Sequence, residues 1–154
     1  MPGHLIRRLQ QISVSVFADR MRNLGHDLTA PQFAALTTLA RAPGIDQATL
    51  AGMIAHDRPT IGGVVERLEG KGLLARTQSK TDRRAKVLVL TAEGEALLET
   101  LTPEIRALQS EILPGLSAEE QATFVALAEK VAKAGNDVAR APLILPTTEP
   151  QDAS

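Results

Sequence analysis

Apolar residues recur every three or four positions along most of the chain, a spacing that places them on one face of an α-helix. The first such stripe consists of Leu5, Leu9, Ile12, Val16, Phe17, Met21 and Leu24. It predicts a long amphipathic helix over residues 4–24 that ends near Gly25. A helix of this length carries more apolar surface than a small domain can cover by itself.

Capping residues divide the following stretch into three shorter helices. Thr29 opens a capping-box sequence, and the helix that it starts stops before Pro43. Asp46 can cap a short third helix, and Asp57 can cap a fourth that ends at Gly72, where glycine suits the left-handed C-terminal residue. The last two helices are joined by a tight turn, so this part of the chain has helix-turn-helix spacing.

The pattern becomes typical of β-structure after Gly72. Residues 73–78 and 85–90 have strand composition, and the polar segment 79–84 between them predicts a hairpin with a charged tip. Together these patterns predict a mainly α-helical fold with a small β-hairpin, in which a winged helix-turn-helix occupies residues 28–91. The hairpin is the wing of this arrangement.

A second pair of helices follows the hairpin. Thr91 can cap a long helix with an apolar stripe, which Pro114 ends, and Ser117 opens another capping box before a last helix. Segments 1–27 and 92–140 are therefore expected to be dimerisation helices, and residues 141–154, rich in proline and polar residues, a flexible tail. Packing of the two long helices on each other within one chain is the alternative.

The charge of the chain is unevenly distributed, although the net charge is −1. Residues 56–86 carry eight basic and four acidic side chains, whereas residues 87–154 carry four basic and eleven acidic ones. A basic block in an otherwise neutral or acidic protein indicates a local site for a polyanion, or else a solvated face.

The residue types and motifs present exclude several classes of function. The sequence has no cysteine, which excludes disulfides, zinc ribbons and thiol-based sensing, and His4, His26 and His56 have no metal-ligand spacing. We expect no metal and no cofactor. Without a phosphate loop, a serine elbow or another catalytic motif we expect no enzyme, and without an apolar run long enough to span a bilayer or a signal peptide we expect no membrane contact and a cytoplasmic location.

The order of these motifs resembles the multiple antibiotic resistance regulator (MarR) family of bacterial transcription factors. The resemblance spans most of the chain to about residue 135, and its most specific parts are Arg67–Leu73, Asp82–Arg84 and Leu90–Gly94. It implies a homodimeric repressor that binds inverted-repeat sites in double-stranded DNA. The predicted dimer-interface residues are Leu5, Leu9, Ile12, Leu108, Ile112, Phe124 and Leu127.

The fourth helix is the predicted DNA-recognition helix, because the first turns of such helices face base edges in the major groove. The candidate contacts are Arg58, Pro59, Thr60, Gly63 and Arg67. Arg58 can bind a guanine, whereas Arg67 can hold a phosphate or pair with Glu66 or Asp82. Family members usually have polar residues at Gly62 and Gly63, so close approach of the backbone and DNA shape are expected to contribute here.

The wing residues Lys80, Asp82, Arg83, Arg84 and Lys86 form the second candidate DNA contact. An arginine at the tip can enter the minor groove, where negative potential is concentrated, or the arginines belong to a solvated turn. The resemblance implies that Asp82 pairs with an arginine and holds the shape of the tip.

A small effector, often an aromatic acid, is also implied by the resemblance. The candidate pocket residues are Phe17, Arg20, Met21, Arg22, His26 and Phe33, in which Arg20 or Arg22 can meet a carboxylate. A stripe of phenylalanine and methionine at helical spacing is more often part of an ordinary core. Two further alternatives are a repressor without an effector and a winged-helix module that contacts proteins.

Overall fold

A computed structural model describes residues 1–54 and 58–136, with the side chains of Arg58 and Pro59 outside that description. Six helices and two strands follow one another in this part of the chain. They are α1 (Pro2–Asn23), α2 (Ala30–Arg41), α3 (Gln47–Met53), α4 (Arg58–Gly70), β1 (Leu74–Gln78), β2 (Lys86–Leu90), α5 (Ala92–Ile112) and α6 (Ala118–Ala134). The predicted fold class, mainly helical with a hairpin, is confirmed.

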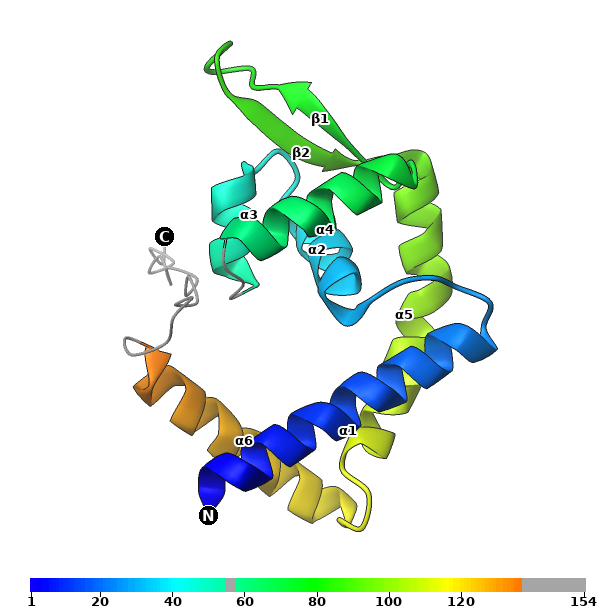
Figure 1. Cartoon of the computed structure of the whole chain (residues 1–154), viewed down its shortest axis with the longest axis vertical. Coiled ribbons are helices and arrows are strands. Elements are labelled where there is room, and N and C mark those ends of the chain that lie inside the picture. Colours follow the sequence, from blue (N-terminus) through cyan, green and yellow to red (C-terminus); the bar gives the residue numbers. More distant parts are fainter. Residues whose placement is uncertain (55–57, 137–154) are drawn as a thin grey trace, which may run out of the picture.

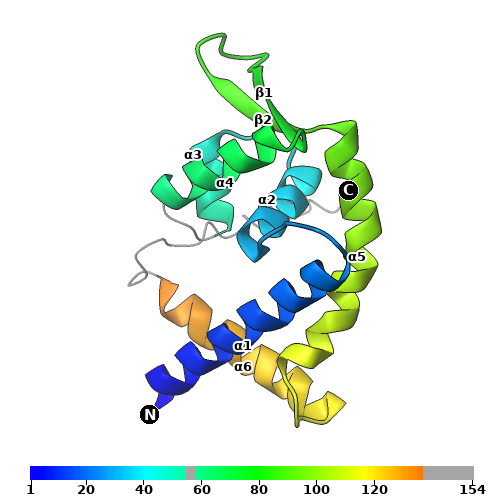
Figure 2. The same cartoon turned by 45° about the vertical axis from the view of Figure 1, so that its right-hand side comes forward.

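The elements form two regions linked by the long helix α5. The hairpin stands at one end of the molecule, with α3 and α4 next to it, and α1 and α6 lie at the opposite end (Figure 1). After a turn of the view, α5 is seen to run from the base of the hairpin to the end where α1 and α6 lie (Figure 2). None of the described helices has the length and apolar character needed to cross a membrane.

The hydrophobic core lies around α2, which contacts α4, β2 and α5. Its largest fully buried side chains include Leu36, Leu39, Leu50, Ile61, Val65, Leu68, Leu74 and Leu101. These residues come from five different elements, so the core forms only when all of them are in place. The same core includes Phe17 and Met21 of α1, so it extends from the winged region into α5 and the end of α1.

The predicted caps are present at the starts of four helices, and at α5 the hydroxyl of Thr91 accepts the N–H of Gly94 over 3.1 Å. The hydroxyls of Thr29 and Ser117 each accept the backbone N–H three residues on. The N–H of each donates in return to the side chain of that residue, which completes a capping box. Asp46 accepts from the N–H of Thr49 over 2.7 Å and starts α3. At the end of α1, Gly25 has a positive φ of 75° and the N–H of His26 bonds the Met21 carbonyl, which closes the last turn.

Gly94 is required by a close backbone approach. A Cβ on this residue would lie 2.1 Å from the carbonyl oxygen of Leu73. The same carbonyl accepts a hydrogen bond from the N–H of Thr91, whose hydroxyl bonds the Gly72 carbonyl. The first turn of α5 is therefore seated directly on the junction between α4 and β1.

Three details differ from the sequence predictions. Helix α1 begins at Pro2 rather than residue 4, and each strand begins one residue later than predicted. Leu108 is 1% exposed within the single chain, so its predicted place in the dimer interface is wrong. Leu108 lines a cavity with Phe17 and Phe33, because its position on α5 faces α1 and α2.

Candidate nucleic-acid interface

Helix α4 has one buried and one exposed face. Ile61, Val64, Val65 and Leu68 are at most 5% exposed and attach the helix to the core. Thr60 and Arg67 are exposed and Gly63 is partly exposed, at spacings of three and four residues. The three predicted contact residues whose side chains are described therefore share the outer face of α4.

Arg67 lies along this face toward the start of the helix. Its guanidinium is 3.9 Å from the position that a Cβ on Gly63 would occupy. Among the described residues, no carboxylate is within ion-pair distance of Arg67, so the alternative in which it pairs with Glu66 or Asp82 is wrong. The cause is geometric: Glu66 is adjacent in the helix and points elsewhere, and Asp82 is engaged at the wing tip.

Packing inside the chain does not require the two neighbouring glycines of α4. A Cβ on Gly62 would lie 3.5 Å from the amide nitrogen of Gln47, which is ordinary contact. Among the described residues, a Cβ on Gly63 would contact just the end of the flexible Arg67 side chain. The glycines leave a shallow surface on the outer face, although each costs about 1 kcal/mol of helix stability relative to alanine.

Strands β1 and β2 pair antiparallel, with Leu74 opposite Leu90 and Gln78 opposite Lys86. A backbone bond from Ser79 to Ala85 over 2.9 Å continues the pairing into the tip. Asp82 accepts the N–H of Arg84 over 3.0 Å. The implied pairing of Asp82 with a guanidinium is wrong for the described residues, because this short carboxylate bonds the local backbone instead and holds the turn in that way.

The basic side chains of the wing extend into solvent. Lys80, Arg83, Arg84 and Lys86 are all exposed, and no described acidic side chain pairs with them. Arg76 on β1 differs, because it lies 3.6 Å from Glu69 of α4. The wing thus presents four unneutralised cations.

The wing is fixed to the helix-turn-helix region at its base. Leu88 exchanges backbone hydrogen bonds with the segment before α3, donating to Ile45 over 2.8 Å and accepting from Gly44 over 2.9 Å. The outer face of α4 and the wing therefore have a defined relative position. The turn before α4, including His56 and the predicted cap Asp57, lies outside the described residues.

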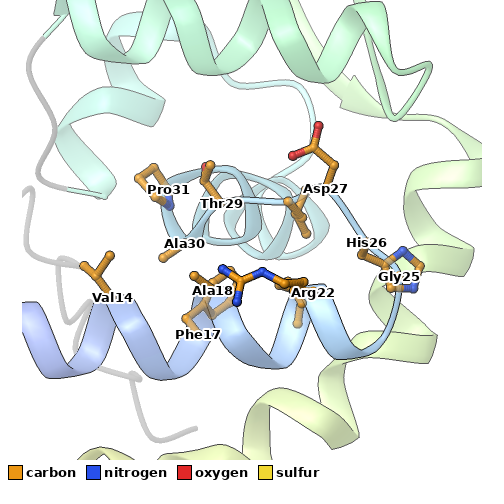
Figure 3. Close-up of a pocket in the computed structure, with 12 residues that line it drawn as sticks. Val14, Phe17, Ala18, Arg22, Gly25, His26, Asp27, Thr29, Ala30 and Pro31 are labelled. Carbon is orange, nitrogen blue, oxygen red and sulfur yellow. The ribbon is translucent and has the colours of Figure 1, made fainter.

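A cavity of about 570 Å³ lies between α1 and the loop that leads into α2. Four candidate effector residues line it, namely Phe17, Met21, Arg22 and His26. Figure 3 shows that Val14, Ala18 and Arg22 come from α1 and that Thr29, Ala30 and Pro31 lie across from them. Arg22 pairs with the exposed Asp19 of its own helix over 3.0 Å.

The other two candidate effector residues lie elsewhere. Arg20 points to α5, where it pairs with Glu104 over 3.0 Å and Glu111 over 2.6 Å. Phe33 lines a second cavity of about 400 Å³ between α1, α2 and α5, and its ring centre is 6.1 Å from that of Phe17. Phe17 borders both cavities. Arg20 is thus occupied by two carboxylates of its own chain.

The apolar residues of the outer helices are largely uncovered. Helix α6 has no buried residue, and Phe124 and Leu127 are 37% and 58% exposed. Leu5 is 59% exposed at the start of α1, and Leu9, Ile12 and Ile112 are partly exposed. Apart from Leu108, the predicted dimer residues are therefore available to a partner.

Sequence reasoning did not identify Lys71 and Gln32. Gln32, at 3% exposure, is the one buried polar side chain among the described residues, and Lys71 donates to it. The capping box at Thr29 indicated the local role of Gln32, but no local pattern indicates its contact with the residue that follows α4.

Comparison with known proteins agrees with this architecture. The sequence model of the MarR family matches residues 28–86. The Escherichia coli O157:H7 transcriptional regulator HosA is 38% identical over 105 residues, which cover 68% of this chain and 78% of HosA.

Two solved structures share the fold over most of both chains. Bordetella bronchiseptica BpsR, described for regulation of its DNA binding by 6-hydroxynicotinic acid, has a TM-score of 0.79 at 32% identity, covering 86% of this chain and 93% of BpsR. A mutant of Escherichia coli MarR complexed with operator DNA has a TM-score of 0.76 at 28% identity, covering 84% of this chain and 91% of that one.

Proposed function

The chain belongs to the MarR family, and on that basis we propose that it is a homodimeric repressor that binds inverted-repeat operator DNA and is released by a small acid. It is a transcriptional regulator and not an enzyme. Operator binding takes place on the chromosome, so its site of action is the cytoplasm.

The observation that carries this proposal is the unpaired basic surface shared by α4 and the wing. Arg67 on α4 and Arg83 and Arg84 on the wing have no described acidic partner, and hydrogen bonds fix the wing to the helices. Unpaired cations on a rigid surface contribute the most binding free energy when they contact phosphates. The reason is that counterions are released from the DNA and no ion pair inside the protein is lost. A module for protein contact has no need of such an arrangement.

Helix α4 is the proposed reading element. Arg58, Pro59 and Thr60 at its start face base edges in the major groove, and Arg67 reaches a phosphate. Gly63 and its neighbour let the helix backbone approach the DNA closely. Sequence preference then depends on few side chains and in part on the shape of the DNA.

The wing supplies the contact in the minor groove. Arg84 or Arg83 enters the groove, and Lys80 and Lys86 contact the adjacent phosphates. Asp82 contributes by holding the tip through the backbone of Arg84. These contacts add affinity for every DNA sequence and little preference among them.

Segments 1–27 and 92–140 are the proposed dimerisation region, and residues 28–91 the DNA-binding domain. The exposed Leu5, Phe124 and Leu127 support this division, because a helix such as α6, which has no buried residue in the single chain, is stable only when another surface covers it. A twofold axis through these helices gives two copies of α4, which suits an inverted repeat.

The cavity beside α1 is the proposed effector site. Phe17, Met21 and His26 supply its apolar and aromatic wall, and Arg22 at its edge can exchange its weak contact with Asp19 for a ligand carboxylate. BpsR responds to an aromatic acid, which supports this ligand class. Arg20 is not a proposed ligand, because two carboxylates already neutralise it.

Selection of bound fragments from random duplex DNA tests the proposal. We expect an inverted repeat to be recovered, with affinity that falls steeply as salt is raised. Sedimentation of the complex should show two chains per duplex. Recovery of no preferred sequence, together with weak and salt-independent binding, contradicts the DNA-binding proposal and favours the module for protein contact.

A further inference from the structure

The end of α4 is joined to the loop between α1 and α2 by the side chain of Lys71. The ammonium group donates a hydrogen bond to the backbone carbonyl of Asp27 and another, over 3.3 Å, to the side-chain oxygen of Gln32. The carboxylate of Asp27 lies 3.8 Å from the same nitrogen. One cation therefore contacts three oxygen atoms, two of Asp27 and one of Gln32, which are 44 and 39 residues away in the sequence.

The attachment point on α2 is buried and rigid. Gln32 is 3% exposed, and its side-chain oxygen also accepts the N–H of Thr29 over 3.2 Å. Loss of the lysine would leave this buried oxygen with a single donor, and the loop carbonyl with none among the contacts described. Lys71 thus contributes to the hydrogen bonding of the segment that starts α2.

The same loop forms one wall of the cavity beside α1. Gly25, His26, Asp27, Leu28 and Thr29 all line that cavity. In Figure 3 the carboxylate of Asp27 points away from α1. The loop therefore contacts the cavity on one side and Lys71 on the other.

Lys71 directly follows the last residue of α4 and lies one helical turn after Arg67. The N–H of Lys71 bonds the carbonyl of Arg67 over 3.0 Å, and the following N–H groups of Gly72 and Leu73 close the end of the helix. Gly72 and Leu73 are in turn bonded to Thr91 at the start of α5. Displacement of Lys71 therefore acts on the last turn of the helix that carries Arg67.

We propose that Lys71 is a positioning residue that couples the loop wall of the cavity to helix α4. A molecule that displaces the loop from the cavity side breaks or tightens the contacts of Lys71 with Asp27 and Gln32, and thereby changes the position of α4 on DNA. This inference rests on the proposed function, in which α4 binds DNA. Coupling between two sites is reciprocal, so DNA on α4 must also alter the loop.

Hydrogen exchange measured with and without DNA tests this coupling in the full-length protein. The DNA is the inverted repeat recovered by selection, at a saturating concentration for each variant. We expect DNA to slow exchange in the loop peptide covering residues 24–29 about threefold or more in the wild type. Lys71→Met should abolish that change while DNA still protects α4, and Lys71→Arg, which keeps a cationic donor, should restore at least part of it.

Two further variants separate coupling from folding and charge. Arg106→Met removes an exposed cation of α5 that has no described partner. In this variant DNA should slow exchange in the loop peptide 24–29 as much as in the wild type. If Lys71→Met is unfolded at the assay temperature, Lys71→Gln, whose polar head is on a shorter stem, replaces it. A lower melting temperature alone does not remove the difference in loop exchange between the free and the DNA-bound protein. This difference therefore reports coupling and not stability.

The results distinguish failure of the inference from failure of the proposed function. If the wild type binds DNA but its loop does not respond, or if Lys71→Met keeps the full response, the coupling role of Lys71 is overturned and the DNA-binding proposal stands. If the wild type binds no DNA, both are overturned.

Discussion

The winged region and the outer helices use the same residue types in opposite ways. Leu36, Leu50 and Leu68 in the winged region are completely buried, whereas Leu5 and Leu127 on α1 and α6 are more than half exposed. The first set completes a core within one chain. The second set forms an apolar surface that one chain leaves open, so amphipathic periodicity alone shows that a helix has an apolar face and not which molecule covers it.

Truncation of one leucine in each region gives the largest expected effect. Leu36→Ala should lower the free energy of unfolding by about 2–5 kcal/mol, because the cavity that it leaves is enclosed on all sides. This loss should be similar at two protein concentrations about a hundredfold apart. The loss caused by Leu127→Ala should instead depend on protein concentration, because the substitution weakens association of the dimer. Chemical denaturation measures both.

A concentration-independent loss for Leu127→Ala would contradict the comparison. It would mean that α6 is covered within one chain, and analytical sedimentation of the same samples would then show single subunits at every concentration.

Two glycines sharpen the boundary of the winged region. Gly94→Ala should lower the free energy of unfolding by about 1–3 kcal/mol, because the added methyl group collides with the Leu73 carbonyl where α5 meets the hairpin. Gly70→Ala on α4 is the matched control, since no atom lies near its Cβ position, and should raise stability by up to about 1 kcal/mol. Thermal melts followed by circular dichroism should give opposite signs, and equal signs would contradict the close approach at Gly94.

Local signals predicted much of the fold, and contacts distant in sequence explain what they missed. Thr29 and Ser117 were identifiable because a capping box is complete within four residues. Leu108 carries the same stripe signal as its neighbours, but the helix α1 that covers it is more than 80 residues away, as the Arg20–Glu104 pair illustrates. Periodicity does not contain that information.

The candidate site follows the same rule. The basic character of the α4–wing region was visible in the segment charges. The contacts of Asp82 with the Arg84 backbone and of Lys71 with Asp27 were not predicted, since a charge pattern does not say whether a charged group meets an ion, an amide or solvent. The pairing of Arg20 with two carboxylates was not predicted for the same reason, because these partners lie on α5.

Removal of single positive charges should affect DNA binding in the winged region and not elsewhere in the chain. Arg84→Ala should weaken binding to all sequences alike. It should also reduce the slope of log affinity against log salt concentration by about one, which corresponds to one lost phosphate contact. Arg58→Ala should cost about 1–3 kcal/mol and relax preference at one position in each half-site. Arg106→Ala on α5 should leave the affinity and the sequence preference unchanged. A fall in affinity equal to that caused by Arg84→Ala would contradict a direct contact between the wing and DNA.

The smallest expected effect concerns the contact between α1 and α5, the helix that links the two regions. Arg20 joins the last turns of α1 to Glu104 and Glu111 of α5, and its side chain is 22% exposed while that of Glu111 is 55% exposed. Because solvent screens an exposed pair, Glu111→Gln should lower the free energy of unfolding by only about 0.2–1 kcal/mol. A double-mutant cycle with Arg20→Met, followed by urea denaturation, isolates the pair from other effects of each change. A coupling energy well above this range would show that charge, and not only the packing of apolar side chains, holds α1 to α5.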